Sequence, residues 1–110
     1  MKVPFAENAV VDLRKLSDYL LDSDHIEGRH KAILWRAALE ISAENAQEVS
    51  TFLLEAVRSN DARVGKLDDY GQRYTVDFVL EWRGKSAIIR SGWIICHGSN
   101  VPRLTTAYPR

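Results

Sequence analysis

The spacing of apolar residues in this 110-residue chain changes near residue 60. Before that point they recur at intervals of three and four, as on one face of an amphipathic helix. After it they alternate with polar residues, as in a strand that is buried on one face. Helices followed by consecutive strands are typical of an α+β fold. We therefore expect N-terminal helices at about 12–58, packed on a four-stranded antiparallel β-meander at about 62–108.

Three helices are predicted in the first half. Asp12 and Ser42 are suitable N-caps for the first and the third, and the second is expected to begin near Gly28, after a loop over residues 22–28. The apolar stripes expected to face the core are Leu13, Leu16, Tyr19 and Leu20 in the first helix, Leu34, Ala37, Ala38 and Ile41 in the second, and Ala46, Val49, Leu53, Ala56 and Val57 in the third.

Four strands are predicted in the second half, at residues 62–67, 74–81, 87–96 and 104–108. Arg83 and Gly84 predict a tight hairpin. The segment 87–96 is almost continuously apolar, so we expect it to be the central strand. Gly92 within it indicates a bulge or a close backbone approach.

Length and composition predict an ordinary globular chain. The residues are 45% hydrophobic and 27% charged, and the length predicts one domain, 1–110. The single cysteine, Cys96, excludes a disulfide framework and a cysteine-based zinc cluster. No signal peptide opens the sequence and no stretch approaches about 18 apolar residues, so we expect a cytoplasmic protein with no membrane partner.

The charges are balanced in sum but not in distribution. The formal net charge is zero, which argues against a strongly basic nucleic-acid binder. Residues 1–60 nevertheless have a net charge of −3 and residues 61–110 a net charge of +3, with no acidic residue after Glu81. A locally positive half suits a polyanionic partner. The alternative is a solvated surface of spread cations.

Motifs for cofactors and metals are absent. No glycine-rich phosphate loop is present, and the histidines lack the spacing of metal ligands on a helix. Asp22 and Asp24 offer a weak metal signal, although acids next to a helix more often serve as caps. We therefore expect no cofactor and no metal.

Three side chains around the start of the second helix are candidates for acid–base work or phosphate binding. His30 precedes Leu34 by one turn and is expected to point at the sheet; its alternative is a core histidine bonded to the backbone. Lys31 is a cation in a first helical turn, where the helix dipole disfavours it, and its alternative is a surface lysine. His25 lies in the acidic loop before the helix, where it is otherwise an exposed loop residue.

Arg90 is the most unusual residue of the predicted sheet. An arginine inside an apolar strand must be paired or placed in a wet cleft. The alternative to a functional role is a salt bridge to Asp77 or Glu81 on the neighbouring strand. Hydroxyl and aromatic groups nearby come from Ser91, Trp93, Thr105, Thr106 and Tyr108.

Four segments together carry a family resemblance: His25-Ile26-Glu27-Gly28-Arg29-His30-Lys31-Ala32, Tyr70-Gly71-Gln72-Arg73-Tyr74-Thr75-Val76-Asp77, Arg90-Ser91-Gly92-Trp93-Ile94 and Pro102-Arg103-Leu104-Thr105-Thr106-Ala107-Tyr108. With them the chain resembles, over nearly its whole length, a family of short bacterial domains of unknown function. Its architecture also resembles the barnase–EndoU–colicin–RelE class of ribonuclease toxins. Those toxins cleave RNA without metal, and many are held inactive by an antitoxin or immunity protein. They are often clearly basic, whereas this chain is neutral.

The second resemblance implies a toxin-like endoribonuclease of a bacterial toxin–antitoxin pair, acting by 2′-hydroxyl attack on the adjacent phosphate. The expected catalytic residues are His25, His30, Lys31, Arg90 and Thr106. One histidine would transfer protons, Lys31 and Arg90 would stabilise the phosphate, and Thr106 would orient it with Ser91. The expected RNA-binding residues are Ser91, Trp93, Arg103 and Tyr108, with Trp93 or Tyr108 stacking on a base. The expected partners are RNA and a cognate inhibitor, and a homo-oligomer is compatible with the sequence.

Two other functions are compatible with the same residues. One is a non-catalytic interaction module, such as an antitoxin, immunity protein or adaptor, which the acidic helical half favours. The other is a small metal-dependent nuclease built on Asp22 and Asp24, which would lose its activity in chelator.

Overall fold

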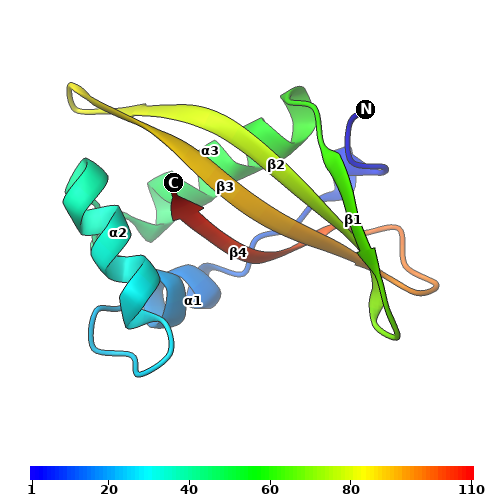
Figure 1. The fold of residues 1–110 in the computed structure, drawn as a ribbon, viewed down its shortest axis with the longest axis horizontal. Helices are drawn as coiled ribbons and strands as arrows, with labels where there is room; N and C mark the ends of the chain where they lie inside the picture. The colour runs from blue at the N-terminus through cyan, green and yellow to red at the C-terminus, as the bar shows by residue number, and fades with distance from the viewer.

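The computed structural model describes all residues, 1–110. The chain begins with a 3₁₀ turn at Ala6–Asn8, followed by a short helix α1 at Leu13–Lys15 that continues as a π-helical turn at Leu16–Leu20. Helix α2 spans Arg29–Leu39. Helix α3 spans Ala46–Ser59 and follows a 3₁₀ turn at Ala43–Asn45. The strands are β1 (Arg63–Leu67), β2 (Gly71–Trp82), β3 (Lys85–Cys96) and β4 (Arg103–Pro109). They pair antiparallel in the order β1-β2-β3-β4 (Figure 1). The predicted α+β fold, with helices before a four-stranded antiparallel meander, is confirmed.

The predicted cap of the first helix is confirmed, whereas Ser42 precedes a 3₁₀ turn and the residue directly before α3 is Asn45. Asp12 Oδ1 accepts a hydrogen bond from the Arg14 amide at 3.0 Å, and Asn45 Oδ1 accepts one from the Ser42 amide at 3.1 Å. Such acceptors satisfy amides that have no partner within the helix. Gly28 directly precedes α2, and a Cβ there would collide with the backbone carbonyl of Tyr19. Only glycine therefore fits this position.

The buried face of α3 is the predicted one, but that of α2 is not. All five stripe residues of α3 are buried, whereas Leu34 of α2 is 43% exposed and Trp35 and Leu39 point into the core. The tryptophan decides this orientation, since its ring is fully buried and its Nε1 donates to the Ala107 carbonyl at 3.0 Å. Burying a tryptophan removes more apolar area from water than burying a leucine. The prediction for α2 is therefore wrong for Leu34 and Ala37, which are exposed, whereas Ala38 packs against the core and Ile41 is buried.

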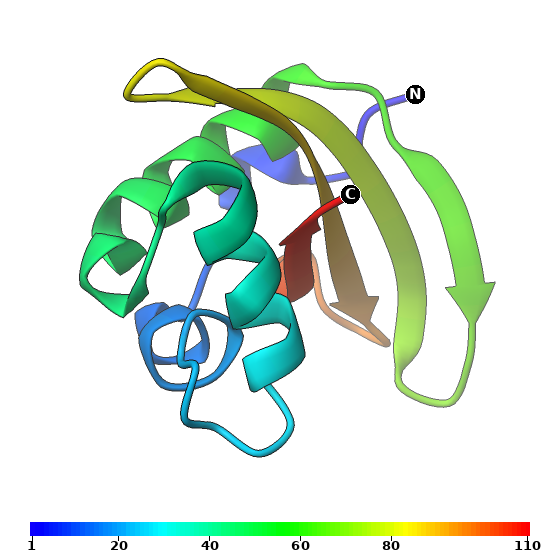
Figure 2. The same cartoon turned by 60° about the vertical axis from the view of Figure 1, so that its left-hand side comes forward.

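The sheet has one covered face and one open face. Val76, Phe78 and Leu80 of β2 are buried on the covered face, and the register adds Ile89 and Ser91 of β3 to it. Figure 2 shows the helices along one side of the curved sheet and no element over the other side. Since successive side chains of a strand point to opposite faces, the residues between these lie on the open face.

The two local irregularities predicted for the strands are confirmed. Arg83 and Gly84 form the tight hairpin between β2 and β3, with φ angles of 48° and 81°. Two consecutive positive φ angles are typical of the turn that matches the twist of paired strands. The register between β3 and β4 shifts at Gly92, so Thr105 is an extra residue on β4. This is a bulge.

One hydrophobic cluster of 22 buried residues connects the helices with the covered face of the sheet. Trp35 of α2 and Trp93 of β3 are both fully buried in it. No helix is both long enough and apolar enough to cross a membrane.

Candidate functional site on the open face of the sheet

Asp77, on the open face of β2, is surrounded by three arginines. Its cross-strand neighbour Arg90 donates from Nε to Oδ1 and from Nη2 to Oδ2, both at 3.0 Å. Arg63 Nη2 lies 3.5 Å and Arg110 Nη1 3.3 Å from the same Oδ2. These four residues are called the Asp77 cluster below. The salt bridge to Asp77, one of the alternatives for Arg90, is confirmed.

The Asp77 cluster keeps an excess of positive charge, because one carboxylate faces three guanidinium groups. The hydrogen bond from Arg90 holds the pKa of Asp77 below its usual range. The same bond raises the pKa of Arg90, so both groups stay ionised at neutral pH. Arg90 directs two of its five N–H donors at Asp77, the other three are not bonded to a carboxylate, and a side-chain hydrogen bond to Tyr108 adds to the raised pKa of Arg90.

Lys31 reaches the Asp77 cluster from α2 by way of Tyr108. Lys31 is half-buried, and its Nζ lies 5.7 Å from the centre of the Tyr108 ring, within range of a cation–π interaction. Tyr108 of β4 lies opposite Arg90 in the register. Asp77 is the main cause of the raised pKa of Arg90, and Tyr108 is a smaller one. The structure thus brings together Lys31, Arg90 and Tyr108, which the sequence had placed in one site.

Thr106 lies beside these residues, opposite Gly92. Its Oγ1 is buried and has no hydrogen-bond partner, which is uncommon for a buried hydroxyl. A Cβ on Gly92 would lie 2.9 Å from Thr105 Oγ1 and 3.1 Å from Thr106 Cγ2. The glycine therefore provides the space that these two side chains occupy. Arg103, exposed at the start of β4, adds a further cation to this strand.

Ser91 and Trp93 lie on the covered face and not on the open one. Both are fully buried. Ser91 Oγ donates to the Val76 carbonyl at 2.8 Å and accepts from Trp93 Nε1 at 3.0 Å. The predicted roles of Ser91 in orienting a phosphate and of Trp93 in stacking on a base do not fit this placement. The alternation of the strand accounts for the difference, because neighbours of Arg90 must face the other way.

His25 has a structural role in the loop before α2. Its Nδ1 accepts hydrogen bonds from the amides of Glu27 and Gly28, both at 3.0 Å, and its ring meets that of Tyr19 edge-on at 4.7 Å. Since an accepting nitrogen carries no proton, the neutral ring holds its proton on Nε2. The Nε2 nitrogen has no hydrogen-bond partner within the protein.

His30 and the acidic loop are placed differently from the sequence-based expectations. His30 is exposed, because the rotation that buries Trp35 turns it away from the sheet. The expectation that it points at the sheet is wrong. Asp22 Oδ1 accepts from the Asp24 amide at 2.9 Å, which is a local turn contact. No group of three histidine, cysteine, aspartate or glutamate side chains is placed to hold a metal ion.

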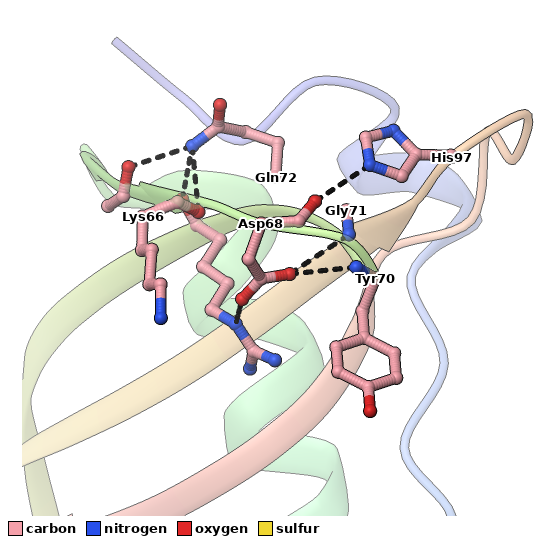
Figure 3. A network of polar contacts seen from close by, with 8 residues as sticks. Lys66, Asp68, Tyr70, Gly71, Gln72 and His97 are labelled. Atoms are coloured by element: carbon pink, nitrogen blue, oxygen red, sulfur yellow. Dashed lines mark hydrogen bonds and ion pairs between the residues drawn. The ribbon is translucent and has the colours of Figure 1, made fainter.

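A second aspartate–arginine pair, which the sequence did not reveal, lies at the β1–β2 hairpin (Figure 3). Asp68 Oδ2 accepts from Arg73 Nε at 2.9 Å, and Oδ1 accepts from the amides of Tyr70 and Gly71 at 2.9 and 3.2 Å. These bonds, that of Arg73 above all, lower the pKa of Asp68 to about 2. His97 Nε2 lies 2.8 Å from the Asp68 carbonyl oxygen. An aspartate two residues before a Tyr-Gly turn was the available signal.

A family model described as Domain of unknown function (DUF6883) matches residues 2–110. The chain belongs to this family. The expected resemblance to a family of unknown function is thereby confirmed. No curated protein matches the sequence.

The fold of this DUF6883 chain is also found among solved structures. It is similar to a chain of the "Contact-dependent growth inhibition toxin - immunity protein complex from Klebsiella pneumoniae 342", with a TM-score of 0.65 and 16% sequence identity. The match covers 96% of this chain and 97% of that chain. At this identity the similarity shows the fold alone.

Proposed function

We propose that the protein is a toxin-like, metal-independent endoribonuclease with a cognate inhibitor, and that it binds RNA on the open face of its sheet. The observation that carries the proposal is the Asp77 cluster beside Lys31 and Tyr108, a concentration of cations on a surface that no other element covers. RNA is a polyanion whose single-stranded bases stack on aromatic rings. The similar fold of a chain from a toxin–immunity complex supports the toxin context.

In this mechanism the 2′-hydroxyl of a ribose loses its proton to a base and attacks the adjacent phosphorus. The bond from phosphorus to the 5′-oxygen then breaks, and that oxygen receives a proton. The free N–H groups of Arg90 and the Lys31 ammonium stabilise the charge on the phosphorane. Tyr108 stacks on a base, and Thr106, whose Oγ1 is buried, lies beneath this surface. His25 is the candidate for the proton transfers, because His30 is exposed on the side of α2 that faces away from the sheet.

The decisive experiment compares cleavage of total RNA and free tRNA, in chelator, by the wild-type protein and by Lys31→Ala and Arg90→Ala. We expect cleavage by the wild type and a loss of about 100-fold or more in each variant, the usual effect of removing a group that stabilises developing charge. Arg58→Ala, which removes an exposed arginine of α3, is the matched control and should cleave normally. Intact RNA with folded wild-type protein would refute the proposal.

The same assay separates the two histidines. Loss of cleavage in His25→Ala alone would assign the proton transfers to His25, and Nδ1 would then have to release the amides of Glu27 and Gly28, since Nε2 can accept a proton only when Nδ1 carries one. Loss in His30→Ala alone would assign them to His30. Thermal melting of His25→Ala is the required control, since Nδ1 of His25 also holds the loop before α2.

A non-catalytic interaction module is the second candidate. Its specific support is that both unusual side chains already have structural partners. Arg90 is bonded to Asp77, and His25 accepts hydrogen bonds from the loop amides, so neither position requires a substrate to explain it. Expression in a bacterial host without a partner distinguishes the two functions. An endoribonuclease is expected to arrest growth, and the Arg90→Ala variant is expected to relieve the arrest. A module of the antitoxin, immunity or adaptor type is expected to be tolerated.

A further inference from the structure

We propose that Arg73 is a second phosphate-binding residue, which contacts single-stranded RNA outside the bond that is cleaved. The inference rests on the proposed endoribonuclease function and deepens it. It implies that the substrate is longer than a dinucleotide and lies across the open face from Arg90 to Arg73.

Arg73 lies on the same face as the Asp77 cluster. It precedes Asp77 by four residues on β2, so the alternation of the strand directs both side chains to the open face. The Arg73 side chain is 37% exposed, whereas that of Asp68 is 17% exposed. The guanidinium is thus accessible to solvent while the carboxylate that holds it is largely covered.

Arg73 and Arg90 are each held by a carboxylate that leaves donors free. Arg73 directs only its Nε–H at Asp68, so four N–H donors on its Nη atoms remain. Asp68 itself is fixed by the amides of the hairpin turn (Figure 3). A guanidinium that is already oriented loses less conformational entropy when it binds a phosphate. Two such groups on one open face are suited to two phosphates of one strand.

The distance between Arg73 and the Asp77–Arg90 pair suits binding of two different phosphates of one strand. Four residues along β2 correspond to about 13 Å. Arg73 is held by Asp68 near one end of this stretch, and Arg90 is held by Asp77 at the other end. Between them a row of small residues crosses the sheet, since Thr75 pairs with Gly92 and Gly92 with Thr106. The row consists of short side chains, with those of Thr105 and Thr106 filling the space beside Gly92, so no long side chain stands in this row between the two guanidinium groups.

The test compares a dinucleotide with a decanucleotide that contains the same cleaved step. For Arg73→Ala we expect KM for the decanucleotide to rise about tenfold, as for the loss of one charge-assisted hydrogen bond, with kcat unchanged. Kinetics on the dinucleotide should equal those of the wild type, because it does not reach Arg73. Arg58→Ala is the control for loss of a cation elsewhere.

Two further measurements distinguish the loss of an RNA contact by Arg73 from a loss of folding and from a general change of charge. Asp68→Asn retains the Arg73 guanidinium and removes the charge that holds it, so KM for the decanucleotide should rise by less than in Arg73→Ala. Binding of a 2′-O-methyl decanucleotide, which cannot be cleaved, should weaken in Arg73→Ala, with a salt dependence lower by about one counterion. Melting temperatures confirm that both variants are folded.

The outcomes are distinguishable. Wild-type cleavage together with an unchanged KM in folded Arg73→Ala overturns this inference and leaves the proposed function standing. An equal rise of KM on both substrates also overturns it, because the effect would then not depend on length. A wild-type protein that cleaves neither substrate overturns the proposed function and this inference with it.

Discussion

Arg90 shows how one side chain serves the fold and leaves donors for a ligand. The bond pair to Asp77 provides the charge partner that an arginine in an apolar strand requires. The same pair fixes the plane of the guanidinium and leaves three N–H groups that are not bonded to Asp77. The salt bridge and the phosphate site, which the sequence presented as alternatives, are therefore compatible in the structure.

Acid should weaken the folded state through Asp68 and Asp77. Hydrogen bonds from Arg73 and Arg90 lower the pKa of these two carboxyls, that of Asp68 to about 2. A carboxyl with a lowered pKa stabilises the fold above its unfolded pKa of about 4, and this contribution is lost as the pH falls through the folded pKa. We expect the free energy of unfolding in urea to decrease between about pH 4 and pH 2.

The Asp68→Asn variant should lose less stability over that pH range, because it lacks one of the two titrating groups. Asp69→Asn, at the exposed neighbouring position, is the control and should follow the wild type. An Asp68→Asn profile parallel to that of the wild type would contradict the linkage to Asp68.

Ser91→Ala should destabilise the protein although it removes a single oxygen. The fully buried hydroxyl connects the Val76 carbonyl to Trp93 Nε1, and its loss leaves a buried indole N–H without a partner. We expect a loss of about 1–3 kcal/mol in the free energy of unfolding, measured in urea. Ser86→Ala, at an exposed position of the same strand, should change it by less than about 0.5 kcal/mol.

At the scale of elements, α2 is where local pattern and packing disagree. The helix has one apolar stripe through Leu34 and another through Trp35 and Leu39, and amphipathicity alone does not choose between them. The chosen stripe contains the tryptophan that bonds to β4. The prediction for His30 failed with that for Leu34, since both depend on the same rotation. Lys31 lies between the two stripes and reaches Tyr108.

Helix α2 also protects the outer edge of β4. Trp35 Nε1 donates to the Ala107 carbonyl at 3.0 Å, and Val10 exchanges backbone hydrogen bonds with Pro102 and Leu104. Trp35→Phe should retain most of the ring and lose the bond, at a cost of about 1–3 kcal/mol from the bond and the space left. In this variant the rate of amide hydrogen exchange should increase more in β4 than in β2. Equal protection of β4 in the variant and the wild type would contradict this role.

At the scale of the whole molecule, the fold turns a neutral chain into one with an open positive face. Residues 1–60, with a net charge of −3, form the helices, and residues 61–110, with a net charge of +3, form the sheet. Because all the helices lie on one face of the sheet, no helix covers the other face (Figure 2). The net charge therefore does not describe the surface that a partner would meet.

Unfolding should be a single cooperative transition. The 22-residue cluster draws on the helices and on the sheet, and Trp35 and Trp93 are buried in it together. Neither half retains its core without the other, so the chain is expected to behave as one domain. Far-UV circular dichroism and tryptophan fluorescence should give coincident melting curves. Separate midpoints for the two signals would show that the helices and the sheet unfold independently.

The sequence by itself determined the elements and their order, because the change of hydrophobic period, the caps at Asp12 and Ser42 and the turn at Arg83–Gly84 are local signals. It also identified Arg90, since a charge in an apolar strand stands out without any coordinates. Only the tertiary structure decided which stripe of α2 is buried and which residues surround Asp77. These depend on contacts between residues far apart in the chain, and the register that places Arg90 between Asp77 and Tyr108 exists only once the strands have paired.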